Sequence, residues 1–101
     1  MTLTTQDRKY NPTAKILITE ACLAKAAGEP ALRHCDIGEE FAADRDVAVA
    51  CVYAGKAVFL DAADDFNRYG GNTVTAAVRA RVASSLRLMS ERAAERAGAG
   101  K

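Results

Sequence analysis

The stretch Thr73–Arg96, TVTAAVRARVASSLRLMSERAAER, has the most regular apolar period in the chain. Its recurring apolar residues lie three or four positions apart: Val74, Val78, Val82, Leu86, Met89 and Ala93. Side chains at this spacing share one face of an α-helix. Asn72 directly precedes the stretch and is a residue type that caps helices. We therefore predict one long helix over about residues 73–96, the longest element of the protein.

The segments upstream of this stretch predict further, shorter helices. Asn11-Pro12 is a typical helix start, and the apolar residues that follow predict a buried helix over residues 12–27, which ends at Gly28. Three more are expected: a short turn at 31–34, a helix of about 37–43, and a helix of about 62–69 with Phe66 and Tyr69 facing inward. The predicted fold class is mainly α, a compact helical domain of four to five helices with a long C-terminal helix.

Residues 47–60 are consistent with two structures. Val47, Val49, Cys51 and Tyr53 alternate with smaller residues, which favours a β-hairpin that turns at Gly55. The same segment also contains an apolar stripe at helical spacing. Alanine is a poor strand former, so a helix is preferred here and a short β-hairpin within 47–60 remains the alternative.

Length and composition indicate one domain. A chain of 101 residues needs most of its length to bury a single core. Within residues 1–101 we expect a polar leader at 1–10 and a disordered tail at 97–101. The sequence contains no signal peptide and no apolar run long enough to span a membrane, and its three cysteines are an odd number. These features favour a cytoplasmic protein with free thiols.

Residue patterns typical of catalysis are missing from the sequence. His34 is the single histidine, and its neighbour Cys35 would point in a different direction from a helix. There is no Cys-x-x-Cys pair for zinc, no glycine-rich phosphate loop and no calcium loop. We therefore expect a protein that is not an enzyme and that has no cofactor and no metal site.

The central part of the chain is acidic although the whole chain carries a net charge of +1. The eight acids between residues 36 and 66 are Asp36, Glu39, Glu40, Asp44, Asp46, Asp61, Asp64 and Asp65, opposed only by Arg45 and Lys56. One interpretation is a partner-binding face that imitates a phosphate backbone or docks on a basic groove. The other is helix capping, because each acidic cluster begins a predicted helix. Neither Glu40 nor Asp65 is expected to be the main cap of its helix.

Residues 36–54 also resemble a helix-turn-helix, with Ile37 in the first helix and Val47 and Cys51 on the buried side of the second. A DNA-binding regulator would use Arg45, Lys56 and the C-terminal arginines near phosphates. The second helix, however, begins with Asp44, Arg45 and Asp46, which is a poor charge pattern for contact with DNA. DNA binding is therefore the alternative function.

In overall character, chiefly the acidic stretch 36–65, the chain resembles the small inhibitors of phages and other mobile elements, the anti-CRISPR proteins. This resemblance rests on no shared motif and assigns no residue. It implies a non-enzymatic protein that docks on a larger protein or ribonucleoprotein complex and blocks access of target DNA. Exposed aromatic residues such as Tyr53 or Tyr69 would anchor the contact.

A second copy of the chain is the other predicted partner. The apolar stripe from Val74 to Ala93 is longer than a core of this size needs to cover. We therefore expect a homodimer through the C-terminal helix, and no association with a membrane.

Overall fold

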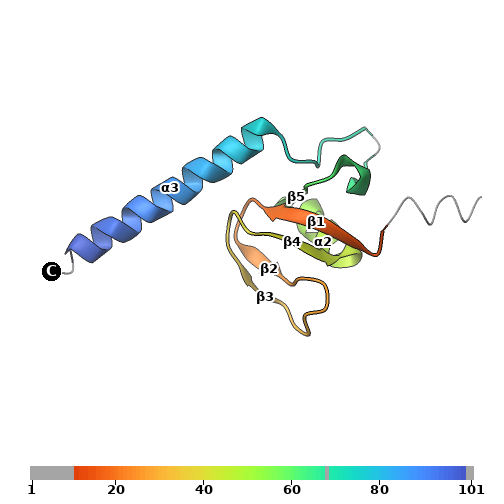
Figure 1. Cartoon of the computed structure of the whole chain (residues 1–101), viewed down its shortest axis with the longest axis horizontal. Coiled ribbons are helices and arrows are strands. Elements are labelled where there is room, and N and C mark those ends of the chain that lie inside the picture. The colour runs from red at the N-terminus through yellow and green to blue at the C-terminus, as the bar shows by residue number, and fades with distance from the viewer. Residues whose placement is uncertain (1–10, 68, 100–101) are drawn as a thin grey trace, which may run out of the picture.

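Residues 11–67 and 69–99 are described by the structure, a computed structural model (Figure 1). Their elements in chain order are β1 (Thr13–Ile18), β2 (Cys22–Ala24), β3 (Arg33–Cys35), β4 (Glu40–Asp44), α2 (Arg45–Tyr53), β5 (Ala57–Phe59), the 3-10 helix η1 (Ala62–Asp64) and α3 (Ala76–Ala99). In this part of the chain five strands accompany two α-helices, so the prediction of a mainly α domain with four to five helices is wrong. The predicted leader at 1–10 lies outside the described residues.

Strand β1 is the centre of a three-stranded antiparallel sheet, with β4 on one side and β5 on the other. Ile16 lies opposite Phe41 in β4 and opposite Phe59 in β5. The predicted helix over residues 12–27 is therefore wrong. A short apolar run fits a buried helix and a buried strand equally well, and the β-branched Ile16 and Ile18 favour the strand.

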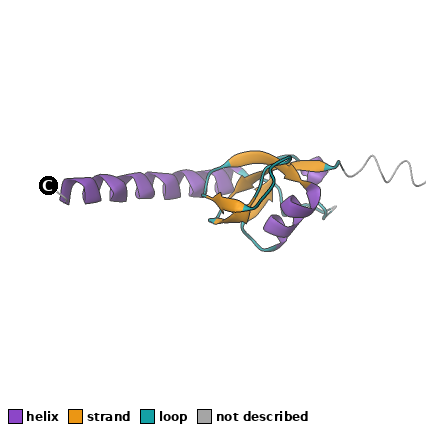
Figure 2. Cartoon of the chain, turned by 90° about the horizontal axis from the view of Figure 1, so that it is seen from below, coloured by secondary structure: helices purple, strands orange, loops and turns teal. Residues whose placement is uncertain are grey.

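Both faces of β1 are covered, which explains why its apolar residues do not simply alternate with polar ones. Ile16 and Ile18 belong to the main core, to which α2 contributes Ala48, Cys51 and Val52. Leu17 points to the opposite face of the sheet, where α3 begins to leave the rest of the molecule. Figure 2 shows α2 on one side of the strands and α3 extending away from them.

Strands β2 and β3 form a separate antiparallel hairpin. Its loop turns at Gly28, whose φ of 88° is a left-handed conformation. The Glu29 carboxylate accepts hydrogen bonds from the Ala26 backbone N–H at 2.6 Å and from Arg33 Nε at 3.3 Å. Because Arg33 begins β3, the helical turn predicted at 31–34 is wrong.

The ambiguous segment 47–60 divides at Gly55 between a helix and a strand. Helix α2 ends at Tyr53, the chain reverses at Gly55 with a φ of 80°, and β5 begins at Ala57. A helix is therefore correct for the first half, and the hairpin alternative is correct only in placing the turn at Gly55. Pairing of β5 with β1, distant in sequence, decides the second half.

The helix predicted at about 37–43 is also wrong, because Glu40–Asp44 is strand β4. The Glu39 carboxylate does accept a hydrogen bond from the Asp36 N–H at 2.6 Å, as in a capping box. The chain nevertheless turns at Gly38, which has a φ of 95° and donates its N–H to the Ile18 carbonyl oxygen at 2.8 Å. Without a first helix, the helix-turn-helix interpretation of residues 36–54 is wrong.

The segment after β5 is mainly a loop. Asp61 caps η1 through a hydrogen bond from the Ala63 N–H at 2.9 Å, but η1 ends at Asp64, so the helix predicted over about 62–69 is wrong. Tyr69, predicted to face inward, is 83% exposed. The Asp65 carboxylate directs the chain into this loop, as described below.

Helix α3 confirms the predicted long helix, with a later start. Thr75 rather than Asn72 caps it, since Thr75 Oγ1 accepts a hydrogen bond from the Val78 N–H at 3.1 Å. Its 24 residues span about 36 Å. The helix reaches Ala99, so residues 97–99, predicted as part of a disordered tail, are helical; residues 100–101 lie outside the described part.

Candidate functional site

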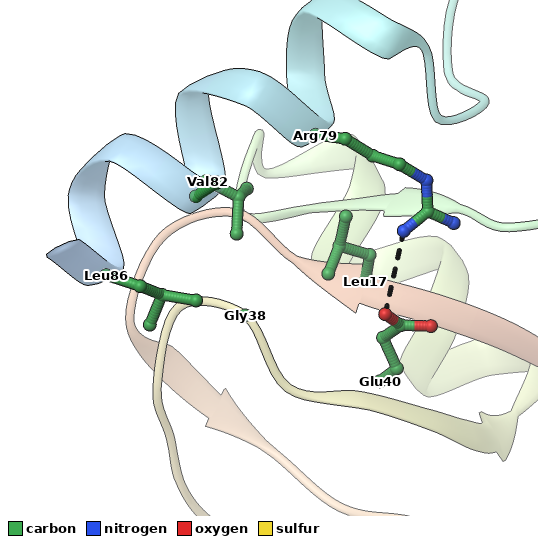
Figure 3. Close-up of a pocket in the computed structure, with 7 residues that line it drawn as sticks. Leu17, Gly38, Glu40, Arg79, Val82 and Leu86 are labelled. Atoms are coloured by element: carbon green, nitrogen blue, oxygen red, sulfur yellow. Dashed lines mark ion pairs between the residues drawn. The ribbon is translucent and has the colours of Figure 1, made fainter.

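The first turns of α3 rest on the sheet at a small apolar seat (Figure 3). Val82 is the buried residue of this contact, with 6% of its surface exposed. Leu17, Gly38 and Leu86 line the same hollow, which has a volume of about 140 Å³. At its edge, Arg79 Nη1 of α3 lies 3.7 Å from Glu40 Oε2 of β4. This seat is where α3 joins the head, the name used here for residues 11–67.

Beyond the seat, α3 has no cover from the described residues. Every side chain from Leu86 to Arg96 is exposed. Leu86, Leu88 and Met89 are large apolar residues that remain 43%, 50% and 46% exposed. Figure 1 shows the helix extending past the strands over most of its length. Apolar side chains therefore line a projecting helix.

These apolar side chains divide between two sides of the helix. At about 100° per residue, Met89 and Ala93 lie on the same side as Val82 and Leu86, and we call these four residues the α3 strip. Arg92 and Arg96 border one edge of the strip. Leu88 lies on the opposite side, together with Glu91 and Glu95. The strip thus continues the buried seat outward along the helix.

The eight acids predicted as a partner-binding face have different surroundings in the structure. Asp64 and Asp65 are buried, with 7% and 8% exposure. Glu39 is paired with Arg33 at 3.1 Å, and Asp36 with His34 at 2.7 Å. The hydrogen bond from the Asp36 N–H and the one from Arg33 hold the pKa of Glu39 below its ordinary value. The structure therefore does not bring all eight acids to one open surface.

The remaining four acids lie at the ends of strand β4 and nearby. Glu40, at its start, is exposed and borders the α3 seat. Asp44, at its end, is partly buried, and the exposed Asp46 follows in the first turn of α2. Asp61 is exposed and caps η1. Two acids of this group bond to a helix start: Asp61 caps η1, and Asp46 Oδ1 accepts from the Val47 N–H of α2 at 2.9 Å, whereas the Asp44 side chain makes no capping hydrogen bond.

Two buried acids have structural roles that the sequence did not reveal. Asp64 Oδ1 lies 3.8 Å from Arg45 Nη1, and Arg45 Nη2 donates to the Asp64 carbonyl oxygen at 2.8 Å. This contact joins α2 to η1 across 19 residues. No local signal marks it, because Arg45 also fits an exposed helical position in the sequence.

Asp65 is the centre of a hydrogen-bond network. Its carboxylate accepts from the Asn67 N–H at 2.8 Å, the Asn72 N–H at 3.0 Å, Asn72 Nδ2 at 3.1 Å and Thr73 Oγ1 at 3.2 Å. Burial raises the pKa of Asp65, but these hydrogen bonds outweigh burial and the pKa lies below its ordinary value. Asp65, which was not expected to be the main cap of a helix, holds the loop that leads to α3.

The aromatic side chains predicted as anchors are on the surface. Tyr53 is 78% exposed and Tyr69 83% exposed. The Tyr53 ring lies edge-on to Phe66, at 6.4 Å between centroids, and Phe66 lies edge-on to the buried Phe59 at 5.8 Å. Tyr53 thus extends outward from the core through Phe66. Their exposure is compatible with a binding role.

The three cysteines, distant in sequence, meet in the structure. Cys22 in β2 lies directly opposite Cys35 in β3, and Cys51 in α2 packs in the same core. All three are free thiols. Residues 11–67 and 69–99 contain no group of three or more His, Cys, Asp or Glu side chains arranged to hold a metal ion. Sequence spacing alone does not reveal that the three cysteines meet, because their contact depends on strand register.

Comparison with protein-family models, with curated proteins and with solved structures gives no match for the chain. None of the helices in the described part is both long and apolar enough to cross a membrane.

Proposed function

We propose that this chain is a non-enzymatic protein that works by protein–protein association, and that α3 is its docking element. The observation that carries this proposal is the α3 strip, which runs from the buried Val82 to the exposed Met89 and Ala93. Isolated helices shorter than about 12–15 residues are marginal in water, and most helical stability in proteins comes from packing of the apolar face, which the turns of α3 beyond the seat lack. Covering Leu86 and Met89 would stabilise α3 by about 1 kcal/mol each.

The occupant we propose for the α3 strip is a second copy of the chain, with its helix antiparallel. In a parallel pair, Arg92 and Arg96 would each approach their own copies and repel them. In an antiparallel pair, Arg96 of the second copy comes to the Leu86 end of the strip. Glu40 borders the seat there with 48% of its side chain exposed, and Asp36 precedes Gly38 by two residues.

The antiparallel arrangement leaves one like-charge approach, that of Arg92 to its copy, against two in the parallel arrangement, and it brings Arg96 of the second copy near Glu40, which also lies 3.7 Å from Arg79; we propose it for these two reasons. The overlap from residue 86 to residue 96 covers about 15 Å of helix, or about three turns. A contact of this length is at the small end of specific interfaces, so the expected affinity is micromolar. Glu91 and Glu95 lie on the outer side and stay in solvent.

Docking of an acidic face on a basic surface of a larger complex, the function expected from the sequence, has less support. Asp64 and Asp65 are buried, and Glu39 is engaged by Arg33. Asp36, Glu40, Asp46 and Asp61 remain exposed on the head, and two of them face a basic side chain, Asp36 that of His34 and Glu40 that of Arg79. Four such acids supply less electrostatic steering than eight.

Sedimentation of the purified full chain over a range of micromolar concentrations tests the proposal. The wild type is expected to form a dimer, and Met89→Asp is expected to be monomeric. Leu88→Asp is the matched control, because Leu88 is equally exposed but lies on the opposite side of α3. A wild-type chain that stays monomeric up to high micromolar concentration, or equal weakening by the two variants, overturns the proposal.

A charge exchange tests the antiparallel direction. Arg96→Glu alone is expected to weaken the dimer several-fold, and Glu40→Arg combined with Arg96→Glu to restore it. Failure of the combined variant to recover dimer formation rules out this arrangement. Helix content measured by circular dichroism shows that each variant is folded.

A further inference from the structure

Two cysteines face each other across the β2–β3 hairpin. Cys22 and Cys35 are Cα partners in the antiparallel register, and the side chains share the face that packs on the core. Directly opposite residues of antiparallel strands have Cα atoms about 4.5–5.5 Å apart. A disulfide bond accepts Cα distances of about 4.4–6.8 Å. The backbone of the hairpin therefore already has the spacing that a disulfide requires.

The third thiol lies beside this pair but on a different element. Cys51 comes from α2 and is 7% exposed. Burial, together with smaller contributions from the neighbouring Cys22 and Cys35, raises the pKa of the Cys51 thiol to about 11. A thiol with so high a pKa is a poor nucleophile at neutral pH. Cys51 is thus a neighbour of the pair and a competing partner for Cys22.

The two members of the pair differ in access. Cys22 is partly exposed, whereas Cys35 is completely buried and donates a hydrogen bond to the Arg33 carbonyl oxygen at 3.6 Å. Burial also raises the pKa of Cys35. A small oxidant from solvent therefore reaches Cys22 first.

We propose that Cys22 and Cys35 are a redox modification site, at which a peroxide converts the two thiols into a cross-strand disulfide. The Cys22 thiol gives up its proton, and the thiolate attacks one oxygen of hydrogen peroxide and breaks the O–O bond; the sulfur becomes a sulfenic acid, and the released hydroxide takes up that proton as one water. The Cys35 sulfur then displaces the hydroxyl group, and the Cys35 proton leaves with it as a second water. Two thiols and one peroxide yield one disulfide and two waters.

The bond would lock a part of the fold that is otherwise weakly held. The β2–β3 sheet has only two strands of three residues each, and such small sheets are marginal without support. A link between residues 22 and 35 closes the whole hairpin loop. Closing a loop stabilises a protein by limiting its unfolded states. Oxidation is therefore expected to raise the melting temperature and to slow amide exchange in residues 23–34.

Peptide mapping of the native full chain tests the site. The chain is treated with hydrogen peroxide, its remaining thiols are alkylated, and it is digested with trypsin. Each cysteine falls in its own tryptic peptide: ILITEACLAK with Cys22, HCDIGEEFAADR with Cys35, and DVAVACVYAGK with Cys51. The expected product links the first two peptides, and the third remains alkylated.

Two controls distinguish a disulfide that the native fold directs from random oxidation of the three thiols. The same treatment in denaturant is expected to give mixed pairings, and Cys51→Ala is expected to keep the native Cys22–Cys35 link. Cys22 joined to Cys51 as the main product, a native mixture like that in denaturant, or no disulfide at all overturns the proposal. Because α3 carries no cysteine, the result is independent of the proposed docking function.

Discussion

Gly38 lies against Leu86: a Cβ atom at residue 38 would stand 2.9 Å from Leu86 Cδ1. This contact joins the turn before β4 to the first exposed position of the α3 strip. Gly38 also has a φ of 95°, which side chains of L-residues rarely adopt. The backbone conformation therefore requires glycine, and any side chain at residue 38 would also have to push the flexible end of Leu86 aside.

Gly38→Ala is expected to lower the free energy of unfolding by about 1–3 kcal/mol. The end of Leu86 can rotate away, so most of the loss comes from the positive φ. Combining Gly38→Ala with Leu86→Ala should therefore recover only a small part of it. Urea denaturation of the single and double variants measures this, and full recovery in the double variant would show that the clash dominates.

Asp65 predicts how stability depends on pH. Its folded pKa is lowered, so its contribution is fully present above the unfolded value of about 3.9 and is lost as the pH falls through the folded pKa. Asp65→Asn should cost about 1.5–3 kcal/mol at neutral pH, because an amide accepts these hydrogen bonds less strongly. Unfolding in urea between pH 7 and pH 3 should be less pH-dependent in the variant than in the wild type; equal pH profiles would contradict the prediction.

The buried pair of Arg45 and Asp64 should matter more than a shorter surface pair. Arg45→Met leaves the Asp64 carboxylate buried without its guanidinium and should destabilise the protein by about 3 kcal/mol. Lys56→Met removes the exposed pair with Glu20, which is only 2.8 Å long, and should cost under about 1 kcal/mol. A loss of unfolding free energy for Lys56→Met that equals or exceeds the loss for Arg45→Met would contradict the prediction that burial outweighs distance.

We expect the second copy in the proposed dimer to protect the projecting half of α3 from amide exchange. In the dimer, backbone amides of residues 88–96 are expected to exchange with deuterium more slowly at high protein concentration than at low concentration. Residues 76–82, seated on the head, should show little change. Exchange that does not depend on concentration anywhere in α3 would argue against a covered strip.

Helix α3 could be predicted from the sequence because the information that specifies it is local. The step of three or four between Val78, Val82, Leu86 and Met89 is set by contacts within one helix, and these hold whatever the rest of the fold does. Likewise, the turn at Gly55 and the cap at Asp61 depend on neighbours two or three residues away. The exposed end of the strip was also anticipated, from its length alone.

Strand β1 could not be predicted from local sequence patterns. The run that contains Ile16, Leu17 and Ile18 is buried on both faces, so it lacks the alternation that identifies a half-exposed strand. Its partners β4 and β5 come more than twenty residues later. Whether such a run coils or extends depends on which distant segments pair with it.

The sequence by itself determined α3 and its apolar strip, because residues within one helical turn of each other specify them. Only the tertiary structure decided that the buried Asp65 carboxylate accepts several hydrogen bonds, that Arg45 pairs with Asp64, and that Cys22 lies opposite Cys35. These contacts depend on strand register and loop closure, and long-range pairing fixes them.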